Sequence, residues 1–181
     1  MMGSHIDTVE TGGAYDGALG VLAGLEVVNT LNDAGIETRH PVAVTFFSNE
    51  EGCRFQPDMM GSCVFTGALS LQEAVAAATP EGVTIADELA RTGLAGEAET
   101  GFCQPRAVLE MHVEQGPILE SEEIQIGAVE GVQGLSWTEI YLEGVSNHAG
   151  TTPMSMRHDA GLVAAEIAVF ARKLALDIAN N

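Results

Sequence analysis

The chain has 181 residues, of which 46% are hydrophobic and 18% charged, and it carries a formal net charge of −19 at pH 7. This balance is typical of a globular protein with a core and excludes a disordered chain. Nucleic acid and anionic membrane surfaces are excluded as partners, because both repel a strongly negative protein. The acidic charge permits a cation-binding site without requiring one.

The cysteines and the apolar runs indicate the compartment. Three cysteines, Cys53, Cys63 and Cys103, are an odd number at irregular spacing, which argues against a disulfide framework. No apolar run is long enough to span a bilayer, and the N-terminus has no basic region followed by an apolar stretch. We therefore expect a cytoplasmic protein without a membrane partner.

The chain opens on the end of a predicted strand that carries a histidine and an aspartate. His5 and Asp7 are two residues apart, so in extended backbone they point to the same side. A metal-ligating histidine commonly donates its second ring N–H to a carboxylate. Asp7 is placed to accept that bond from His5 or to lie just behind a metal, and an ordinary pair of turn residues is the alternative.

A glycine-rich turn over residues 11–17 leads into a predicted helix from Ala18 to Asn32, in which apolar residues recur at helical spacing. Asp16 stands where the turn enters this helix. Aspartate is a preferred N-cap residue, which alone would account for it. Its two oxygens are equally well placed to bridge two cations.

The next predicted strand, Pro41 to Phe47, is apolar almost throughout, which indicates burial on both faces. Glu50 and Glu51 follow it closely. Unpaired charges beside an apolar core are costly. The pair is explained if a metal neutralises one carboxylate and the other transfers a proton, as in metal-assisted hydrolysis. Two acidic residues at the start of a surface helix are the alternative.

The middle of the chain is predicted to hold helices over residues 64–78 and 85–92 and an exposed linker over 96–100. Residues 108–113 then alternate as a strand does. This alternation places three polar side chains on one face of an otherwise apolar run: Glu110, His112 and Glu114.

Strand ends bring the candidate residues together. Ligands of open α/β sheets gather at the carboxyl ends of the strands. On this reading His5, Glu50, Glu51 and His112 all lie at such ends. We expect them to meet at one edge of the sheet.

The pattern changes near residue 125. Strands are predicted over residues 126–132 and 137–142, followed by a helix over 157–176. Strand, strand and helix in this order form half of a small α+β sandwich. We therefore predict an α/β chain with a first domain over residues 1–124 and part of a second over 125–181.

Five motifs of this chain occur in the order found in one family. They are residues 3–7 (GSHID), 15–17 (YDG), 49–52 (NEEG), 112–117 (HVEQGP) and 147–154 (NHAGTTPM). The chain resembles the M20-type metallohydrolases, specifically the amidase/carbamoylase branch. That branch contains N-carbamoyl-L-amino-acid hydrolases, β-ureidopropionase-like enzymes and allantoate amidohydrolases. The resemblance covers nearly the whole chain, and the last two motifs are specific to the branch.

The resemblance implies a domain organisation and a metal centre. Residues 1–124 look like a partial catalytic domain with a mixed sheet, followed by part of an α+β dimerisation, or lid, domain that pairs two subunits. His5, Asp16 and His112 look like ligands of one metal, with Asp16 bridging to a second metal held by Glu51. The residue types suit two divalent ions, whether zinc, manganese, cobalt or nickel.

The resemblance also implies roles in catalysis. Glu50 resembles the general base that deprotonates the bridging water, and Asp7 matches the carboxylate that braces His5. His148 looks like the residue that reaches into the active site of the neighbouring subunit and stabilises the charged oxygen of the tetrahedral intermediate. Gln115 matches a substrate contact.

The departures from the family pattern lie at the ends of the chain. Family members have a further metal-binding histidine near the C-terminus, and asparagine and arginine substrate contacts in the second domain; none can be assigned here. The first strands and helix of the fold are also not found before Met1. We therefore expect a fragment whose isolated activity is weak or absent.

The leading hypothesis is an amidohydrolase that cleaves a C–N bond of N-carbamoyl (ureido) amino acids with metal-bound water as the nucleophile. Residues 131–137 (GVQGLSW) look more like the carbamoylases than the allantoate enzymes. The alternatives are an allantoate amidohydrolase, an M20 peptidase or deacylase, and a non-catalytic folded fragment of such an enzyme.

Overall fold

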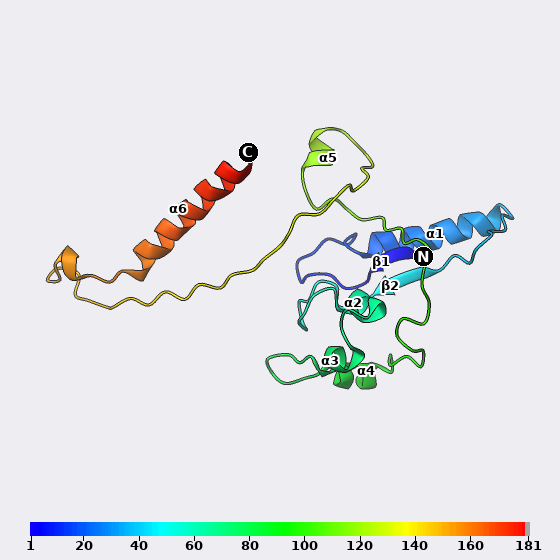
Figure 1. The fold of residues 1–181 in the computed structure, drawn as a ribbon, viewed down its shortest axis with the longest axis horizontal. Helices are drawn as coiled ribbons and strands as arrows, with labels where there is room; N and C mark the ends of the chain where they lie inside the picture. The colour runs from blue at the N-terminus through cyan, green and yellow to red at the C-terminus, as the bar shows by residue number, and fades with distance from the viewer. Residues whose placement is uncertain (180–181) are drawn as a thin grey trace. The chain divides into compact units, whose positions relative to one another are not determined.

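The computed structural model of the protein describes residues 1–179. These form two compact units, Met1–Gly127 and the stretch from Ala128 on (Figure 1). The first unit contains β1 (Met2–His5), α1 (Ala18–Asp33), β2 (Val44–Phe47), α2 (Met60–Thr66), α3 (Leu71–Ala76), α4 (Ile85–Thr92) and α5 (Ile118–Ser121), and the second contains the 3₁₀ helix η1 (Met154–Met156) and α6 (Ala160–Ala179).

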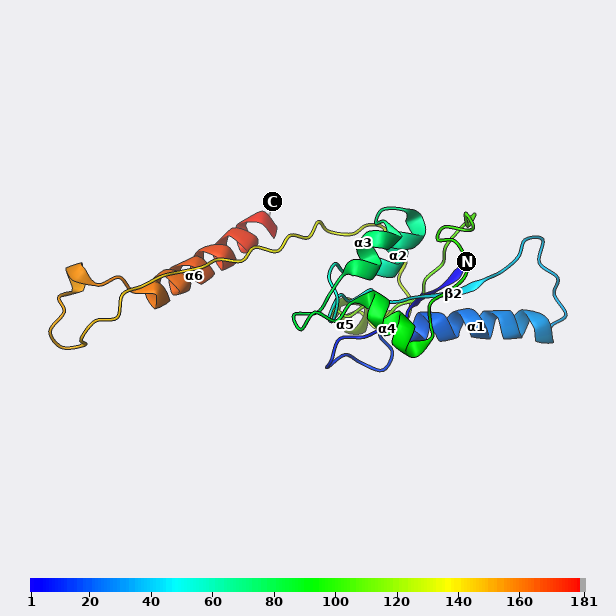
Figure 2. The ribbon, with the colours of Figure 1, turned by 90° about the horizontal axis from the view of Figure 1, so that it is seen from below.

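The first unit is built on a β1–α1–β2 arrangement. The two strands pair in parallel, from Met2 opposite Val44 to His5 opposite Phe47. Helix α1 connects them and lies along the strands (Figure 2). Because the strands are parallel, the residues after His5 and after Phe47 leave the sheet at the same edge. This confirms the α/β class and the shared edge, whereas the expected mixed sheet is not found, since the described strands pair only in parallel.

Close packing of α1 against β1 depends on glycines. Gly20 and Gly24 are the buried residues of this helix. A Cβ atom at Gly20 would lie 2.4 Å from the carbonyl oxygen of Met111 and 2.7 Å from the Cβ atom of Ser4. The missing side chain thus lets three segments approach: the helix, the first strand and the segment that carries His112.

The second strand differs from the prediction in length and burial. It spans Val44–Phe47 instead of starting at Pro41, and Phe46 on it is exposed. The expectation of burial on both faces is therefore wrong. Within the described residues β2 has β1 as its one partner strand and is contacted by the helices α1 and α2, so its other edge has no strand partner.

The predicted helix over residues 64–78 is two helices. Gly67, with φ of 79°, ends α2 in the left-handed conformation. Ser70 then starts α3 as its N-cap, with its hydroxyl accepting from the N–H of Glu73. Helix α4 is confirmed over Ile85–Thr92. A small apolar core joins these helices: Phe55, Met60 and Ala74, with Val64, Leu69, Ala77 and Ile85 against them.

The segment over residues 108–113 is not a strand, which corrects the prediction. It touches β1 at one parallel bridge, Leu109 with Met2, where the Gly3 N–H donates to the Leu109 oxygen at 3.2 Å. Two residues later the Met111 carbonyl lies against Gly20 of α1. The segment thus turns away from β1 toward α1 after Leu109, and its backbone hydrogen bonds to β1 end there.

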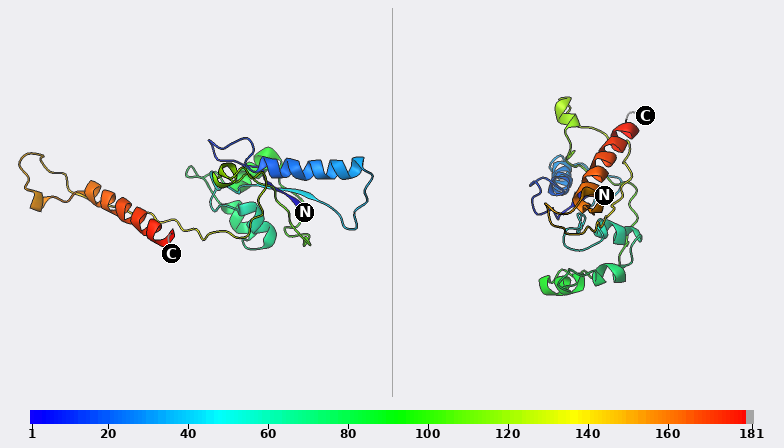
Figure 3. Two further views of the ribbon diagram at one scale, coloured as in Figure 1. Left: turned by 90° about the horizontal axis from the view of Figure 1, so that it is seen from above. Right: turned by 90° about the vertical axis from the view of Figure 1, so that its left-hand side faces the viewer.

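The second unit contains the predicted helix but not the predicted strands. Helix α6 begins at Ala160 (Figure 3). The Asp159 carboxylate caps this end, since it accepts from the N–H groups of Gly161 and Leu162. Residues 126–142 hold no strand, and no backbone hydrogen bond pairs their two apolar segments within the described chain. Trp137 in this stretch is 89% exposed. A β-strand needs a neighbouring strand for its backbone hydrogen bonds, and within the described residues these two segments have none.

No helix within residues 1–179 is both long enough and apolar enough to cross a membrane.

Candidate metal centre

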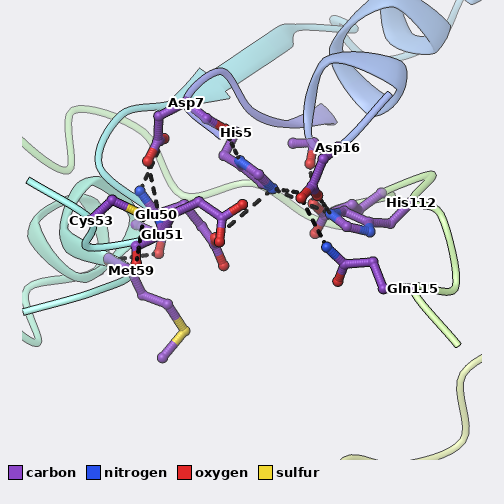
Figure 4. A network of polar contacts seen from close by, with 12 residues as sticks. His5, Asp7, Asp16, Glu50, Glu51, Cys53, Met59, His112 and Gln115 are labelled. Atoms are coloured by element: carbon purple, nitrogen blue, oxygen red, sulfur yellow. Dashed lines mark hydrogen bonds and ion pairs between the residues drawn. The ribbon is translucent and has the colours of Figure 1, made fainter. Parts of the chain in front are cut away.

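Three predicted ligands meet at the carboxyl edge of β1 and β2. The Nε2 atoms of His5 and His112 are 3.2 Å apart. The Oδ1 atom of Asp16 lies 3.7 Å from the first and 3.3 Å from the second. Figure 4 shows these side chains pointing toward one another. His5 and Asp16 are 4% and 6% exposed, whereas His112 is exposed and leaves the cluster open to solvent on its side.

Each ligand reaches this point from a different segment. His5 is the last residue of β1, and Asp16 comes from the turn before α1. The N-cap of α1 is Gly17, and no side chain caps the helix. The alternative prediction that Asp16 is the N-cap of α1 is therefore wrong. Its carboxylate instead enters the cluster.

The hydrogen bonds of the two imidazoles determine where their protons lie. His5 Nδ1 is 2.7 Å from the carbonyl oxygen of Asp7, and His112 Nδ1 is 2.8 Å from that of Val113. A carbonyl oxygen only accepts, so each Nδ1 carries the proton and each neutral ring offers a lone pair at Nε2. The 3.2 Å between the two Nε2 atoms suits an N–H···N hydrogen bond when one ring carries a second proton. A cation between two neutral rings would be bound by both lone pairs.

Two buried carboxylate oxygens support the same conclusion. Asp16 Oδ1 and Glu51 Oε1 are buried and have no hydrogen-bond partner among the described residues. Buried polar atoms without partners are rare and costly. Imidazole nitrogens and carboxylate oxygens are donors that divalent transition metals accept. The residues at this edge therefore fit a metal centre.

The second carboxylate cluster overlaps the first. Ligand atoms of His5, Glu50 and Glu51 lie within 4.8 Å of one another, as do those of His5, Asp16 and His112. Burial, and then the charges of Asp16 and Glu50, raise the pKa of Glu51 above its ordinary value, while His5 acts against them. Negative charges are thus crowded here without a matching positive charge.

The raised pKa of Glu51 gives a test by pH. The folded metal-free protein binds this proton more tightly than the unfolded chain, so the stability it gives is fully present below about pH 4.5 and is lost as pH rises through the raised pKa. A metal ion competes with the same proton. We expect the gain in Tm on adding Zn²⁺ to shrink as the pH falls from about 8 to about 5.

Thermal melts with and without Zn²⁺ across this range measure the effect, with Glu51→Gln as the matched variant. Its metal-free Tm at neutral pH should exceed that of the unmodified protein, because a buried charge is removed. A Zn²⁺-induced gain that stays constant with pH in the unmodified protein would speak against the site.

Asp7 has a different partner from the one expected. Its backbone carbonyl, not its carboxylate, accepts from the His5 ring. The carboxylate instead accepts the N–H of Glu50 at 3.0 Å and that of Glu51 at 3.1 Å. The turn after β2 presents these two N–H groups, and a carboxylate is the side chain that satisfies both. Asp7 therefore holds in place the backbone of both glutamates.

Replacing Asp7 by asparagine tests this arrangement. An amide offers one oxygen, so one of the two N–H groups loses its acceptor and the Glu51 side chain loses its fixed position. We expect about 10–100-fold weaker metal binding, the range for partners that orient metal ligands. Calorimetric titration measures the affinity, and Asp33→Asn at the exposed end of α1 is the control. Unchanged affinity in Asp7→Asn would show that this contact does not support the site.

Gln115 also lies in this network. Its Nε2 donates to Asp16 Oδ2 at 2.9 Å, so Gln115 steadies the shared carboxylate. Its expected contact with substrate remains a prediction. Ser4 was not among the predicted site residues, yet its hydroxyl donates to the Glu110 carboxylate and ties β1 to the His112 segment. Ser4 could have been identified in the sequence as a small polar residue next to a predicted ligand, His5, at the end of a strand.

His148 belongs to the second unit. Its side chain is exposed, and its Nδ1 accepts from the N–H groups of Gly150 at 3.0 Å and Thr151 at 3.2 Å. Two donors at Nδ1 leave the proton of the neutral ring on Nε2. His148 is thus prepared to donate a hydrogen bond through Nε2.

The chain thus combines an α/β framework with a histidine and carboxylate cluster, a candidate metal site, at the carboxyl edge of parallel strands. The description "Peptidase family M20/M25/M40" belongs to the family model that matches residues 1–178. The chain is a member of this family.

Relatives of this chain are hydrolases of C–N bonds. It is 51% identical to an N-carbamoyl-L-amino-acid amidohydrolase of Rhizobium meliloti, over 97% of this chain and 42% of the relative. A ureidoglycolate hydrolase of Arabidopsis thaliana is 37% identical, over 97% of this chain and 39% of the relative. The chain spans about two fifths of the length of these relatives.

The fold of the chain is similar to solved structures of amidases. An amidase of the hydantoinase/carbamoylase family from Burkholderia multivorans has a TM-score of 0.79 and 40% identity, over 97% of this chain and 43% of that one. A second, from Burkholderia ambifaria, has a TM-score of 0.75 and 44% identity, over 93% and 41%.

Proposed function

We propose that the protein is a metal-dependent amidohydrolase that cleaves a C–N bond of N-carbamoyl amino acids. The observation that carries the proposal is the convergence of His5 Nε2 and His112 Nε2 on Asp16 Oδ1, which is buried without a hydrogen-bond partner among the described residues. The substrate class rests on the relatives that cover almost the whole chain. Water and a ureido amino acid would give the amino acid, ammonia and carbon dioxide.

His5, Asp16 and His112, which form one of the two clusters, would hold one divalent ion. The family resemblance assigns a second ion to Asp16 and Glu51, whose buried oxygens both lack a hydrogen-bond partner among the described residues. Zinc, manganese, cobalt and nickel are the candidates. Bound ions would supply Lewis-acid polarisation of the substrate carbonyl and a lowered pKa for water. Gln115 would keep the Asp16 carboxylate oriented between the two positions.

Glu50 has the properties of a general base. Its Oε2 lies 3.8 Å from His5 Nε2, and its side chain is 36% exposed. It is thus close to the cluster yet open to the water that it would deprotonate. The proton then passes to the leaving nitrogen, because the departing group must leave neutral. Asp7 fixes the backbone from which Glu50 extends.

His148 would donate its Nε2 hydrogen bond to the oxygen on which negative charge develops. We assign residues 1–124 to a catalytic domain and residues 125–181 to a dimerisation domain, so that His148 serves the site of a second subunit in a homodimer. A cytoplasmic location belongs to the same proposal.

A second candidate is a related ureido compound. The relatives include the ureidoglycolate hydrolase and a probable allantoate deiminase of Oryza sativa, 36% identical over 92% of this chain and 35% of the relative. The ureido group is common to all these named activities. A peptidase or deacylase would instead cleave an amide that has no ureido group. A non-catalytic protein would turn over neither ureido compounds nor amides.

A substrate panel tests the proposal. The metal-loaded protein is given N-carbamoyl-L-amino acids, allantoate, N-acetyl amino acids and dipeptides, with ammonia or free amine as the readout. We expect ammonia from N-carbamoyl-L-amino acids at rates above those of all other compounds. Faster turnover of dipeptides or N-acetyl amino acids, or no turnover of any compound, would contradict the proposal.

A further inference from the structure

The loop over residues 147–153, here called the His148 loop, holds its histidine through its own backbone. The N–H groups of Gly150 and Thr151 both donate to His148 Nδ1. The orientation of the ring and the position of its proton therefore depend on how these two peptide units are turned. Something must hold them, because the loop is exposed and contains no helix or strand.

Arg157 supplies that support. Its Nη2 donates to the carbonyl oxygens of Ala149 at 2.7 Å, Thr152 at 2.8 Å and His148 at 3.4 Å. The short helix η1 turns the chain back between the loop and Arg157. One guanidinium thus donates hydrogen bonds to three carbonyls of the His148 loop, two near its start and one near its end.

A single peptide unit links the arginine to the imidazole. The carbonyl of Ala149 and the N–H of Gly150 belong to the same planar group and point in opposite directions. The oxygen binds Arg157 on one side, and the N–H donates to His148 Nδ1 on the other. Hydrogen bonds in series polarise one another, and the donor at the head of this series is charged.

The charge of Arg157 has no other evident use. Within the described residues no carboxylate forms an ion pair with it, and its Nε is buried without a hydrogen-bond partner. Burying part of a cation without a counter-charge is costly. Its polar contacts in the structure are the carbonyls of the His148 loop.

We propose that Arg157 is a positioning residue for His148: it holds the Ala149–Gly150 peptide so that the His148 proton stays on Nε2. The proposal rests on the proposed function in one respect, the use of His148 as a hydrogen-bond donor to the reacting substrate. Arg157 itself touches no reacting atom.

The first test is spectroscopic and needs no substrate. ¹⁵N NMR of the His148 ring is recorded for the unmodified protein and for Arg157→Met, Arg157→Lys and Arg39→Met. Arg39 is an exposed arginine outside the loop and serves as the control. We expect Nδ1 to be unprotonated and Nε2 protonated in the unmodified protein, the control and the lysine variant. In Arg157→Met the two tautomers should mix.

The second test is a kinetic cycle with an N-carbamoyl-L-amino acid. Arg157→Met should lower kcat by about 10–100-fold, the range for groups that orient a functional ligand, with little change in KM. The same change made in a His148→Ala background should have no further effect. Arg157→Lys should restore most of the rate.

The outcomes separate the two proposals. Unchanged His148 signals in Arg157→Met, or an equal loss of kcat with and without His148, would overturn the role of Arg157. If the unmodified protein releases no ammonia from N-carbamoyl substrates, the proposed function fails, while the NMR comparison still decides the positioning role. If Arg157→Met does not fold, Arg157→Gln, which keeps a neutral NH₂ donor, takes its place in both tests.

Discussion

Changing Glu50 to glutamine is expected to lower kcat for an N-carbamoyl-L-amino acid by about 10²–10⁴-fold, the usual contribution of a general base. The amide keeps the shape of the side chain but cannot take up a proton. Because the Glu50 backbone is held by Asp7, the variant should keep its fold and its turn geometry. Steady-state kinetics and metal analysis on the same sample measure both quantities.

The controls separate proton transfer from metal binding. Glu26→Gln, on the exposed face of α1, should leave kcat unchanged. Glu51→Gln should reduce metal content, whereas Glu50→Gln should retain it. Equal rates for the unmodified protein and Glu50→Gln would remove Glu50 from the mechanism.

Removing His5 should abolish metal binding. His5 is the one residue common to both candidate clusters, and it is almost fully buried at the end of β1. Loss of a direct ligand should weaken binding more than loss of an orienting partner, that is, by more than about 100-fold. Calorimetric titration with Zn²⁺ or Mn²⁺ tests His5→Ala, and activity should fall with metal content.

His40→Ala is the matched control for this experiment. His40 lies in the exposed segment before β2, where its backbone oxygen accepts from the Thr38 hydroxyl. Its replacement should leave affinity and stoichiometry as they are. If His5→Ala binds metal as tightly as His40→Ala, the candidate centre does not exist.

Local patterns predicted the part of the fold that holds the site. Helix α1 and the ends of β1 and β2 follow from helical spacing, glycine placement and a short apolar run. Parallel pairing then brings His5 and Glu50 to one edge, as the strand ends indicated. These features depend on residues close in sequence, which is why a pattern captures them.

Features that depend on distant contacts were missed. Residues 108–113 alternate as a strand does, yet they leave the sheet where Met111 meets Gly20, a contact across α1 that no local pattern contains. Residues 126–142 have strand-like composition but no partner within the described chain. Pairing, not composition, makes a strand.

Side-chain roles at the site were partly predictable. Residue type indicated that His5 and Asp16 could ligate a metal, but it could not decide between a cap and a ligand for Asp16. The structure leaves the cap position to Gly17. Likewise the His-x-Asp spacing suggested a carboxylate brace, whereas the peptide oxygen of Asp7 is the acceptor and its carboxylate turns to Glu50 and Glu51.

Anomalous diffraction from crystals of the zinc-loaded protein is the sharpest test of whether His5, Asp16 and His112 bind a metal, because it locates the ions among named atoms. We expect a peak bonded to the Nε2 atoms of both His5 and His112 and to an Asp16 oxygen, with Glu51 nearby and Glu50 unbound. Peaks bound only elsewhere on the protein, with His5 and His112 in direct contact, would contradict it.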